Sequence, residues 1–91
     1  MKRLYFAKRV MEQVELQAER MPLLPLVELC GDKRVLVENH KGIIEYSEEK
    51  IGIAVRYGTL LIIGNHLCLH QITKFQLVIC GQISTIQLLK G

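Results

Sequence analysis

The residues best suited to chemistry are His66, Cys68 and His70, which alternate along one predicted strand. Successive side chains of a strand point to opposite faces, so these three are expected to project from the same face. Imidazole and thiolate groups bind zinc, but a closed structural site needs four ligands. The fourth would have to come from His40 or another cysteine, which the sequence does not place. A polar strand face is therefore favoured over a metal site, and no cofactor is expected.

Two other cysteines, Cys30 and Cys80, each stand directly before a glycine. A small side chain there is expected to pack as a buried hydrophobe under a corner of the chain. A nucleophilic cysteine would need a base and surroundings that lower its pKa, and no local motif provides them. The paired carboxylates of Glu48 and Glu49 lie beside Lys50 in a predicted turn, which is typical of solvated charge. No catalytic residue is assigned, and the prediction is a protein that is not an enzyme.

The stretch from Asn39 to Gly42 offers two interpretations. Its asparagine, histidine and lysine side chains could bind a ligand beside a flexible glycine. The same residue types also form hairpin turns, because asparagine and glycine tolerate positive φ angles. A hairpin between residues 35–37 and 43–44 is the favoured interpretation, and a recognition role stays open.

Length and charge narrow the class of protein. The chain has 91 residues, 49% of them hydrophobic, which suffices for one core only. It lacks the run of about 18 apolar residues that a transmembrane helix requires, and its charged start has no apolar secretory region behind it. Three cysteines, an odd number, argue for a reducing compartment, so the expected location is the cytoplasm. Basic and aromatic residues do not interleave, so nucleic acid is not expected as a partner.

Residues 1–21 are predicted to form an amphipathic helix that ends at Pro22 and Pro25. Its apolar residues recur in steps of three and four, the spacing of one helical stripe. The stripe comprises Leu4, Ala7, Met11, Val14, Ala18 and Met21. Leu4, Met11 and Val14 are candidates for contact with a protein partner. Four basic residues near the start also allow contact with an anionic membrane surface, although three glutamates dilute this charge.

Residues 22–91 are predicted to form an all-β domain, because apolar residues there alternate with period two. Turn residues divide the segment into seven or eight short strands. A weak repeat of two apolar residues, a glycine and a polar residue recurs around Gly31, Gly64 and Gly81. This regularity favours a small antiparallel sandwich or roll, with a short β-solenoid as the alternative.

The pattern also predicts which strands lie at the edges of the sheet. Residues 60–63 are apolar on both faces, so their strand should be central. Residues 33–38 and 84–88 keep polar side chains and are expected to be edge strands. An edge is a template for pairing with another chain, so residues 82–89, with Ile86 at their centre, are expected to bind a second copy or a partner strand.

One stretch of the sequence resembles a known family. Its residues are Glu38, Asn39, His40, Lys41, Gly42 and, after Ile43, Tyr46. They are similar to the signature of the YabP/YqfC sporulation proteins, particularly of the YqfC branch. Spacing of Pro25, the 57–60 segment and the closing 79–83 segment is also similar, so the resemblance spans nearly the whole chain.

The resemblance implies expression in the mother cell of an endospore-forming bacterium and a structural or assembly role in building the spore. It carries over no catalytic activity. We therefore expect an interaction module that binds sporulation proteins. A membrane-surface adaptor anchored by the basic helix and a small metal-binding protein are the alternatives.

Overall fold

The computed structural model describes residues 24–91, which form one antiparallel sheet. Its strands are β1 (Leu26–Cys30), β2 (Arg34–Glu38), β3 (Ile43–Tyr46), β4 (Lys50–Val55), β5 (Gly58–Ile72) and β6 (Gln76–Lys90). The all-β prediction is confirmed. Residues 1–21, with the predicted helix and its candidates Leu4, Met11 and Val14, lie outside the described residues.

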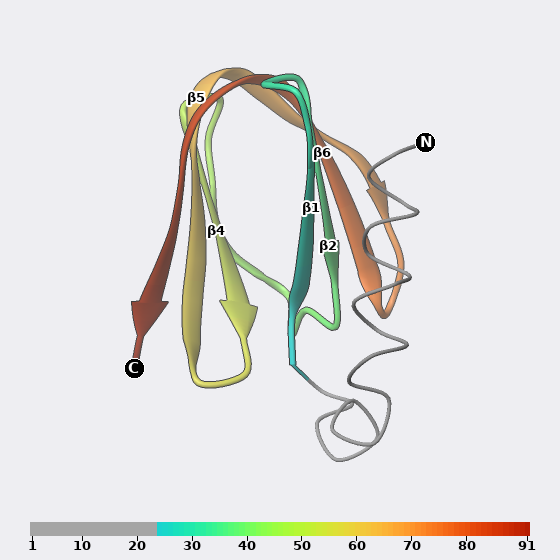
Figure 1. Cartoon of the computed structure of the whole chain (residues 1–91), viewed down its shortest axis with the longest axis vertical. Coiled ribbons are helices and arrows are strands. Elements are labelled where there is room, and N and C mark those ends of the chain that lie inside the picture. The colour runs from blue at the N-terminus through green and yellow to red at the C-terminus, as the bar shows by residue number, and fades with distance from the viewer. Residues whose placement is uncertain (1–23) are drawn as a thin grey trace.

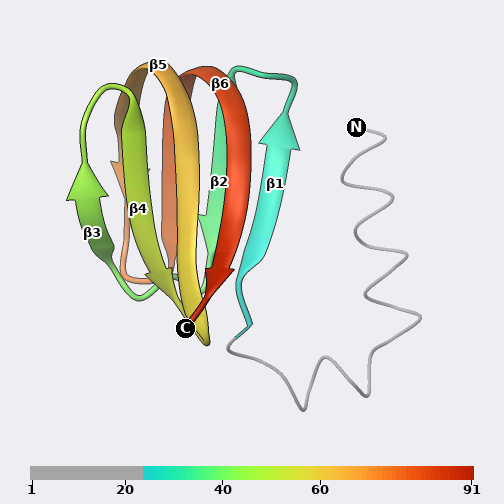
Figure 2. The same ribbon diagram turned by 90° about the vertical axis from the view of Figure 1, so that its left-hand side faces the viewer.

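The sheet has the order β1-β2-β6-β5-β4-β3 and is folded over on itself. Figure 1 shows β5 and β6 arching over one end of the molecule, so that each contributes to both halves of the fold. The first layer contains β1, β2, the beginning of β6 and the end of β5. The second layer contains β3, β4, the beginning of β5 and the end of β6 (Figure 2). The arrangement is the predicted roll rather than a solenoid.

Close backbone approach at two glycines produces the arch. A Cβ atom at Gly64 would overlap the carbonyl oxygen of Gln82, and one at Gly81 would lie 2.7 Å from the carbonyl oxygen of His66. Gly81 and His66 have φ angles of 140° and 54°, and the pairing of β5 with β6 shifts register here. Such bulges bend a strand without ending it. The prediction of seven or eight strands was therefore wrong, because two expected turns are bends inside β5 and β6.

The core lies between the two layers. Along each strand, its fully buried members follow the period of two that the sequence predicts. Across strands, residues that pair directly lie on the same face. Val35 and Val37 pair with Ile79 and Leu77 in the first layer. The buried hydrophobic side chains are Val35, Val37, Ile51, Ile53, Val55, Leu60, Ile62, Leu67, Leu77, Ile79 and Ile83.

Strand order tests the predicted edges. β5 lies between β4 and β6, so the central position of residues 60–63 is confirmed. β2 lies between β1 and β6, and the prediction that residues 33–38 form an edge was wrong because β1 adds outside them. Residues 84–88 belong to the part of β6 that β2 does not reach, so they lie at an edge among the described residues.

Candidate interaction surface

The segment with the family resemblance links the two layers. Asn39 follows β2 with a φ of 63°, and its backbone N–H donates to the carbonyl oxygen of Phe75 at 2.7 Å. Its side-chain Nδ2 donates to the carbonyl oxygen of Leu24 at 2.9 Å. The asparagine therefore ties the end of β2 to two distant parts of the chain.

His40 and its neighbours continue this link toward the second layer. The His40 Nδ1 accepts the N–H of Gly42 at 3.0 Å, so its Nε2 is assigned the proton and donates to the carbonyl oxygen of Thr73 at 2.8 Å. The N–H of Lys41 donates to the carbonyl oxygen of Ala54 at 2.7 Å. The predicted hairpin was wrong, because β2 pairs with β1 and β6 whereas β3 pairs with β4.

The three candidate metal ligands have separate surroundings. His66 lies at the bend, where its Nδ1 is 3.7 Å from the Glu48 carboxylate. Cys68 pairs directly with Cys80, and His70 lines a hollow on the outer face of the first layer. All three side chains are exposed, whereas Leu67 between them is buried and Leu69 is half-buried, so the predicted alternation of faces is observed despite the register shifts in this part of β5. Within residues 24–91, no three His, Cys, Asp or Glu residues are grouped to hold a metal ion.

The cysteines lie on the outer face rather than under the corners. Cys30 is exposed and Cys80 is half-buried, so the prediction of burial was wrong for Cys30. Pairing of Cys30 with Arg34, and of Arg34 with Cys80, places all three on the face away from the core. On this face Cys30 and Arg34 are exposed, whereas Cys80 is half-buried.

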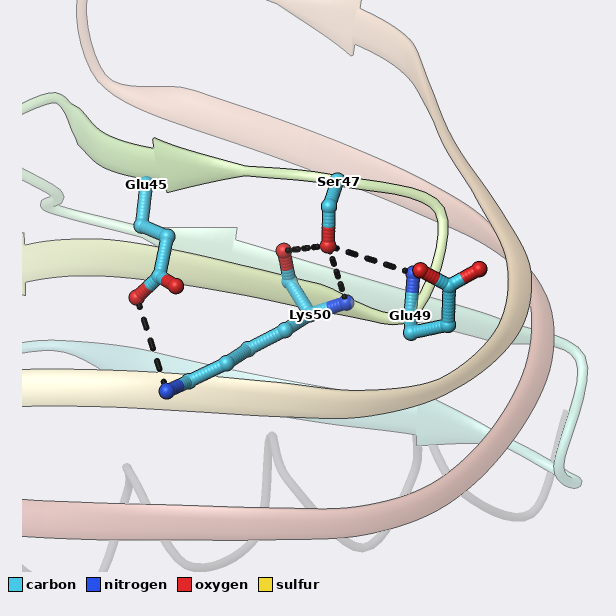
Figure 3. Close-up of polar contacts among 4 residues, drawn as sticks. All are labelled: Glu45, Ser47, Glu49 and Lys50. Atoms are coloured by element: carbon cyan, nitrogen blue, oxygen red, sulfur yellow. Dashed lines mark hydrogen bonds and ion pairs between the residues drawn. The ribbon is translucent and has the colours of Figure 1, made fainter.

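The turn that joins β3 to β4 is held by its own polar groups (Figure 3). The Ser47 hydroxyl accepts the backbone N–H groups of Glu49 and Lys50 at 3.3 and 3.0 Å and donates to the Lys50 carbonyl oxygen at 3.2 Å. Outside the turn, the Lys50 ammonium lies 3.6 Å from the Glu45 carboxylate, and both side chains are about half exposed. Glu48 and Glu49 are both exposed, so their carboxylates are solvated as predicted, and the Ser47 hydroxyl stabilises the turn.

That turn helps to close one side of the folded sheet, here called the closed side, where β3 faces the end of β5. The N–H of Leu69 donates to the Tyr46 hydroxyl oxygen at 3.0 Å, and the N–H of Leu67 donates to the Glu48 carbonyl oxygen at 2.8 Å. Leu69 and Ile43 are partly buried against the core. Hydrogen bonds and apolar contacts thus join the two layers on this side.

The opposite side, here called the open side, lies between β1 and the end of β6 (Figure 2). It is defined by Val27, Leu29, Ile86 and Leu88. Register places all four on the inward face, since their direct partners Val37, Val35, Ile62 and Leu60 are buried core residues. Yet Val27, Leu29 and Leu88 are 36%, 44% and 52% exposed, and Ile86 is only partly buried.

An unpaired backbone edge runs beside these side chains. β6 pairs with β2 only as far as Cys80, after which Gly81 and Ile83 donate to the carbonyl oxygens of Lys33 and Asp32. From residue 84 to residue 90, no strand of the described chain pairs with the outer edge of β6. Of the open side, the sequence prediction named Ile86 and included Leu88 within residues 82–89, but it did not include Val27 or Leu29. Leu88 lies two residues further along the strand, and Val27 and Leu29 are also two residues apart. The same apolar period of two was therefore present at these residues.

Comparison with known proteins agrees with the resemblance in the signature segment. A family model described as the YabP family matches residues 25–91. An uncharacterized protein, YqfC of Bacillus subtilis (strain 168), is 23% identical over 74 residues, which cover 81% of this chain and 80% of the relative. No solved structure matches. Among residues 24–91, no helix has the length and apolar character needed to cross a membrane.

Proposed function

Because the chain belongs to the YabP family, we propose that it acts in spore formation as a non-enzymatic assembly module that binds protein through its open side. Family membership indicates the sporulation-related role. The observation that carries the binding role is the contrast between the two sides of the fold: one side completes its core, whereas the other leaves inward-facing apolar side chains in contact with solvent.

Two properties of the open side support protein binding. First, covering a leucine side chain fully gains roughly 1.5–3 kcal/mol, and Leu88 is still 52% exposed. Second, the unpaired edge of residues 84–90 can accept a strand by main-chain hydrogen bonds, a common mode of protein recognition. Apolar contact provides affinity, and the backbone edge fixes the orientation of the bound strand. Both features lie at the same place on the molecule.

The positions of the titratable side chains support a non-enzymatic role. Both ring nitrogens of His40 bond to backbone groups, and His66 lies beside Glu48 in solvent. Neither histidine contacts Cys68, the exposed thiol on β5, through any hydrogen bond of the described residues. Free cysteines also accord with action in the reducing cytoplasm of the mother cell.

A pair of adjacent leucines provides the test. Leu88 faces the open side, whereas Leu89 pairs with Thr59 and projects from the outer face at 42% exposure. Replacing the chromosomal copy by a Leu88→Lys variant should reduce heat-resistant spores by at least about tenfold, since a charge cannot be covered by an apolar partner. Leu89→Lys, with the same change of charge, should leave spore counts near normal. Equal counts for the two variants would contradict the proposal.

A second arm tests the enzymatic alternative in the same strain. A triple variant, His66→Ala, Cys68→Ala and His70→Ala, should sporulate normally because none of these side chains contributes to the open side. Immunoblots must show equal protein levels for all variants. Loss of spores in the triple variant, with normal counts for Leu88→Lys, would favour chemistry at these residues over binding.

A further inference from the structure

We infer that the occupant of the open side is a second copy of this chain, whose residues 84–90 pair antiparallel with the same residues of β6 about a two-fold axis at Gln87. This inference rests on the proposed function, since it names the partner of the same surface. The argument comes from the orientation of the backbone groups of β6, the register that they allow and the distribution of charge along the strand.

The backbone of β6 presents alternate residues to its free edge. The N–H of Gly91 donates to the carbonyl oxygen of Tyr57, on the β5 side. Because backbone groups two residues apart in a strand point the same way, those of Leu89, Gln87 and Thr85 also face β5. The backbone groups of Ile86, Leu88 and Lys90 therefore face away from β5, toward the unpaired edge.

A two-fold axis at Gln87 uses the whole free edge. In antiparallel pairing about this residue, Ile86 lies opposite Leu88 of the second copy, and Ser84 lies opposite Lys90, so all of residues 84–90 pair. The outward-facing residues Ile86 and Leu88 then form hydrogen-bonded pairs, as the alternation requires. An axis at Ile86 would pair residues 84–88 alone, and one at Leu88 would pair residues 86–90 alone. Overlap selects Gln87.

The side chains suit this arrangement on both faces. On the inward face, Ile86 and Leu88 of one copy meet Leu88 and Ile86 of the other and extend the apolar core across the axis. Lys90 is the single charged residue among residues 84–90. In the dimer it lies opposite Ser84 of the second copy, and not opposite the Lys90 of that copy. The added strand would also lie on the side where β1 is the outermost strand of the first layer (Figure 2).

Cysteine cross-linking tests the register. The full chain is prepared with Cys30→Ala, Cys68→Ala and Cys80→Ala, and its folding is checked by circular dichroism. At the axis the two Gln87 residues form a non-hydrogen-bonded pair, with Cα atoms about 4.5 Å apart, within the range for a disulfide. The Gln87→Cys chain, treated with oxidised glutathione, should form a covalent dimer at least about tenfold faster than the Thr85→Cys chain.

A mixture of chains gives a second, independent reading of the register. Thr85 lies opposite Leu89 of the second copy, so Thr85→Cys and Leu89→Cys chains should cross-link with each other but not with themselves. Sedimentation of the unmodified chain at tens of micromolar should show a dimer, which Leu88→Lys and Ile86→Lys disperse. Ile44→Lys should not disperse it, because this side chain is 62% exposed on β3, at the other end of the sheet.

Two outcomes would overturn the inference. Equal cross-linking rates at residues 85, 87 and 89 would indicate random collision rather than a register. A monomer in sedimentation would exclude the second copy. If Leu88→Lys still abolishes spores while Leu89→Lys does not, the open side binds a different protein and the proposed function stands. If the two variants sporulate alike, the proposed function fails as well.

Discussion

The closed and open sides of this fold belong to the same sheet, yet they differ in the contacts that join the two layers. On the closed side, Tyr46 and the turn after β3 reach across to the end of β5 and bond to its backbone. On the open side, β1 faces the end of β6 without a comparable contact among the described residues. Leu69 on the closed side is packed against the core, whereas Leu88 on the open side is 52% exposed.

The difference teaches that alternation of apolar residues does not by itself complete a core. Both sides have inward-facing leucines paired with buried neighbours. What separates them is the chain that covers the edge. A polar turn and a tyrosine cover it on one side, whereas within residues 24–91 no equivalent segment covers β6 beyond Ile83 on the other. The side whose core is covered contributes to the stability of the monomer, whereas the exposed side is the one that we propose for assembly.

The largest expected effect concerns the arch on which both sides depend. In Gly64→Ala, the new methyl group would overlap the Gln82 carbonyl oxygen, which is backbone and cannot rotate away. We expect the free energy of unfolding to fall by about 3 kcal/mol, measured by urea denaturation. Gly31→Asn is the control, because its φ of 54° suits asparagine and its surroundings are open, so the loss should stay below about 1 kcal/mol. Equal losses would show that the close approach does not limit the fold.

A second prediction compares the two sides directly. Leu69→Lys puts a charge against the core on the closed side and should lower the free energy of unfolding by about 2–3 kcal/mol. Leu88→Lys should cost the monomer less than about 1 kcal/mol, because this side chain is already half exposed. Denaturation must be followed at low micromolar concentration, since self-association would add apparent stability. A larger loss for Leu88→Lys than for Leu69→Lys would reverse the assignment of the two sides.

Much of this fold was predictable from local pattern. Period two from Val35 to Ile79 identified the strands, and the doubly apolar 60–63 segment identified a central one. The bends at Gly64 and Gly81 were not predictable, because a glycine followed by a polar residue serves equally in a turn that reverses the chain and in a bulge that only bends it. The choice depends on distant backbone partners, such as the Lys33 carbonyl oxygen that accepts the Gly81 N–H.

The interaction surface was predictable only in part. The sequence indicated Ile86 because residues 84–88 keep polar side chains, which predicted an edge strand open to pairing with another chain. The same prediction, for residues 82–89, included Leu88. Val27 and Leu29 also follow the period of two, but their exposure depends on which strand lies across from them, and the sequence does not give that strand. The signature segment was misinterpreted for the same reason: Phe75 and Thr73, whose carbonyl oxygens accept hydrogen bonds from Asn39 and His40, lie more than thirty positions away in the sequence.

The third prediction concerns this signature segment, which joins the two layers at the end away from the arch. His40→Ala removes the hydrogen bond to the Thr73 carbonyl oxygen and the acceptor for the Gly42 N–H. Its expected cost is about 1–2 kcal/mol in the free energy of unfolding. Lys41→Ala is the matched control, because its side chain is exposed while its backbone bond to Ala54 remains, and it should change stability by less than about 0.5 kcal/mol. Similar losses for both would mean that the ring does not hold the layers together.

The smallest expected effect tests the bond that distinguishes the closed side. Tyr46→Phe keeps the ring but removes the hydroxyl oxygen that accepts the Leu69 N–H, and should cost about 1 kcal/mol in the free energy of unfolding. Tyr57→Phe, at a ring that is 66% exposed, serves as the control and should cost less than about 0.5 kcal/mol. Amide exchange gives the sharper measurement: the Leu69 N–H should exchange several-fold faster in Tyr46→Phe, since local opening then breaks one bond fewer. Cross-linking through Gln87→Cys on the open side should be unaffected. Unchanged exchange at Leu69 would show that apolar packing, and not the hydroxyl, closes this side.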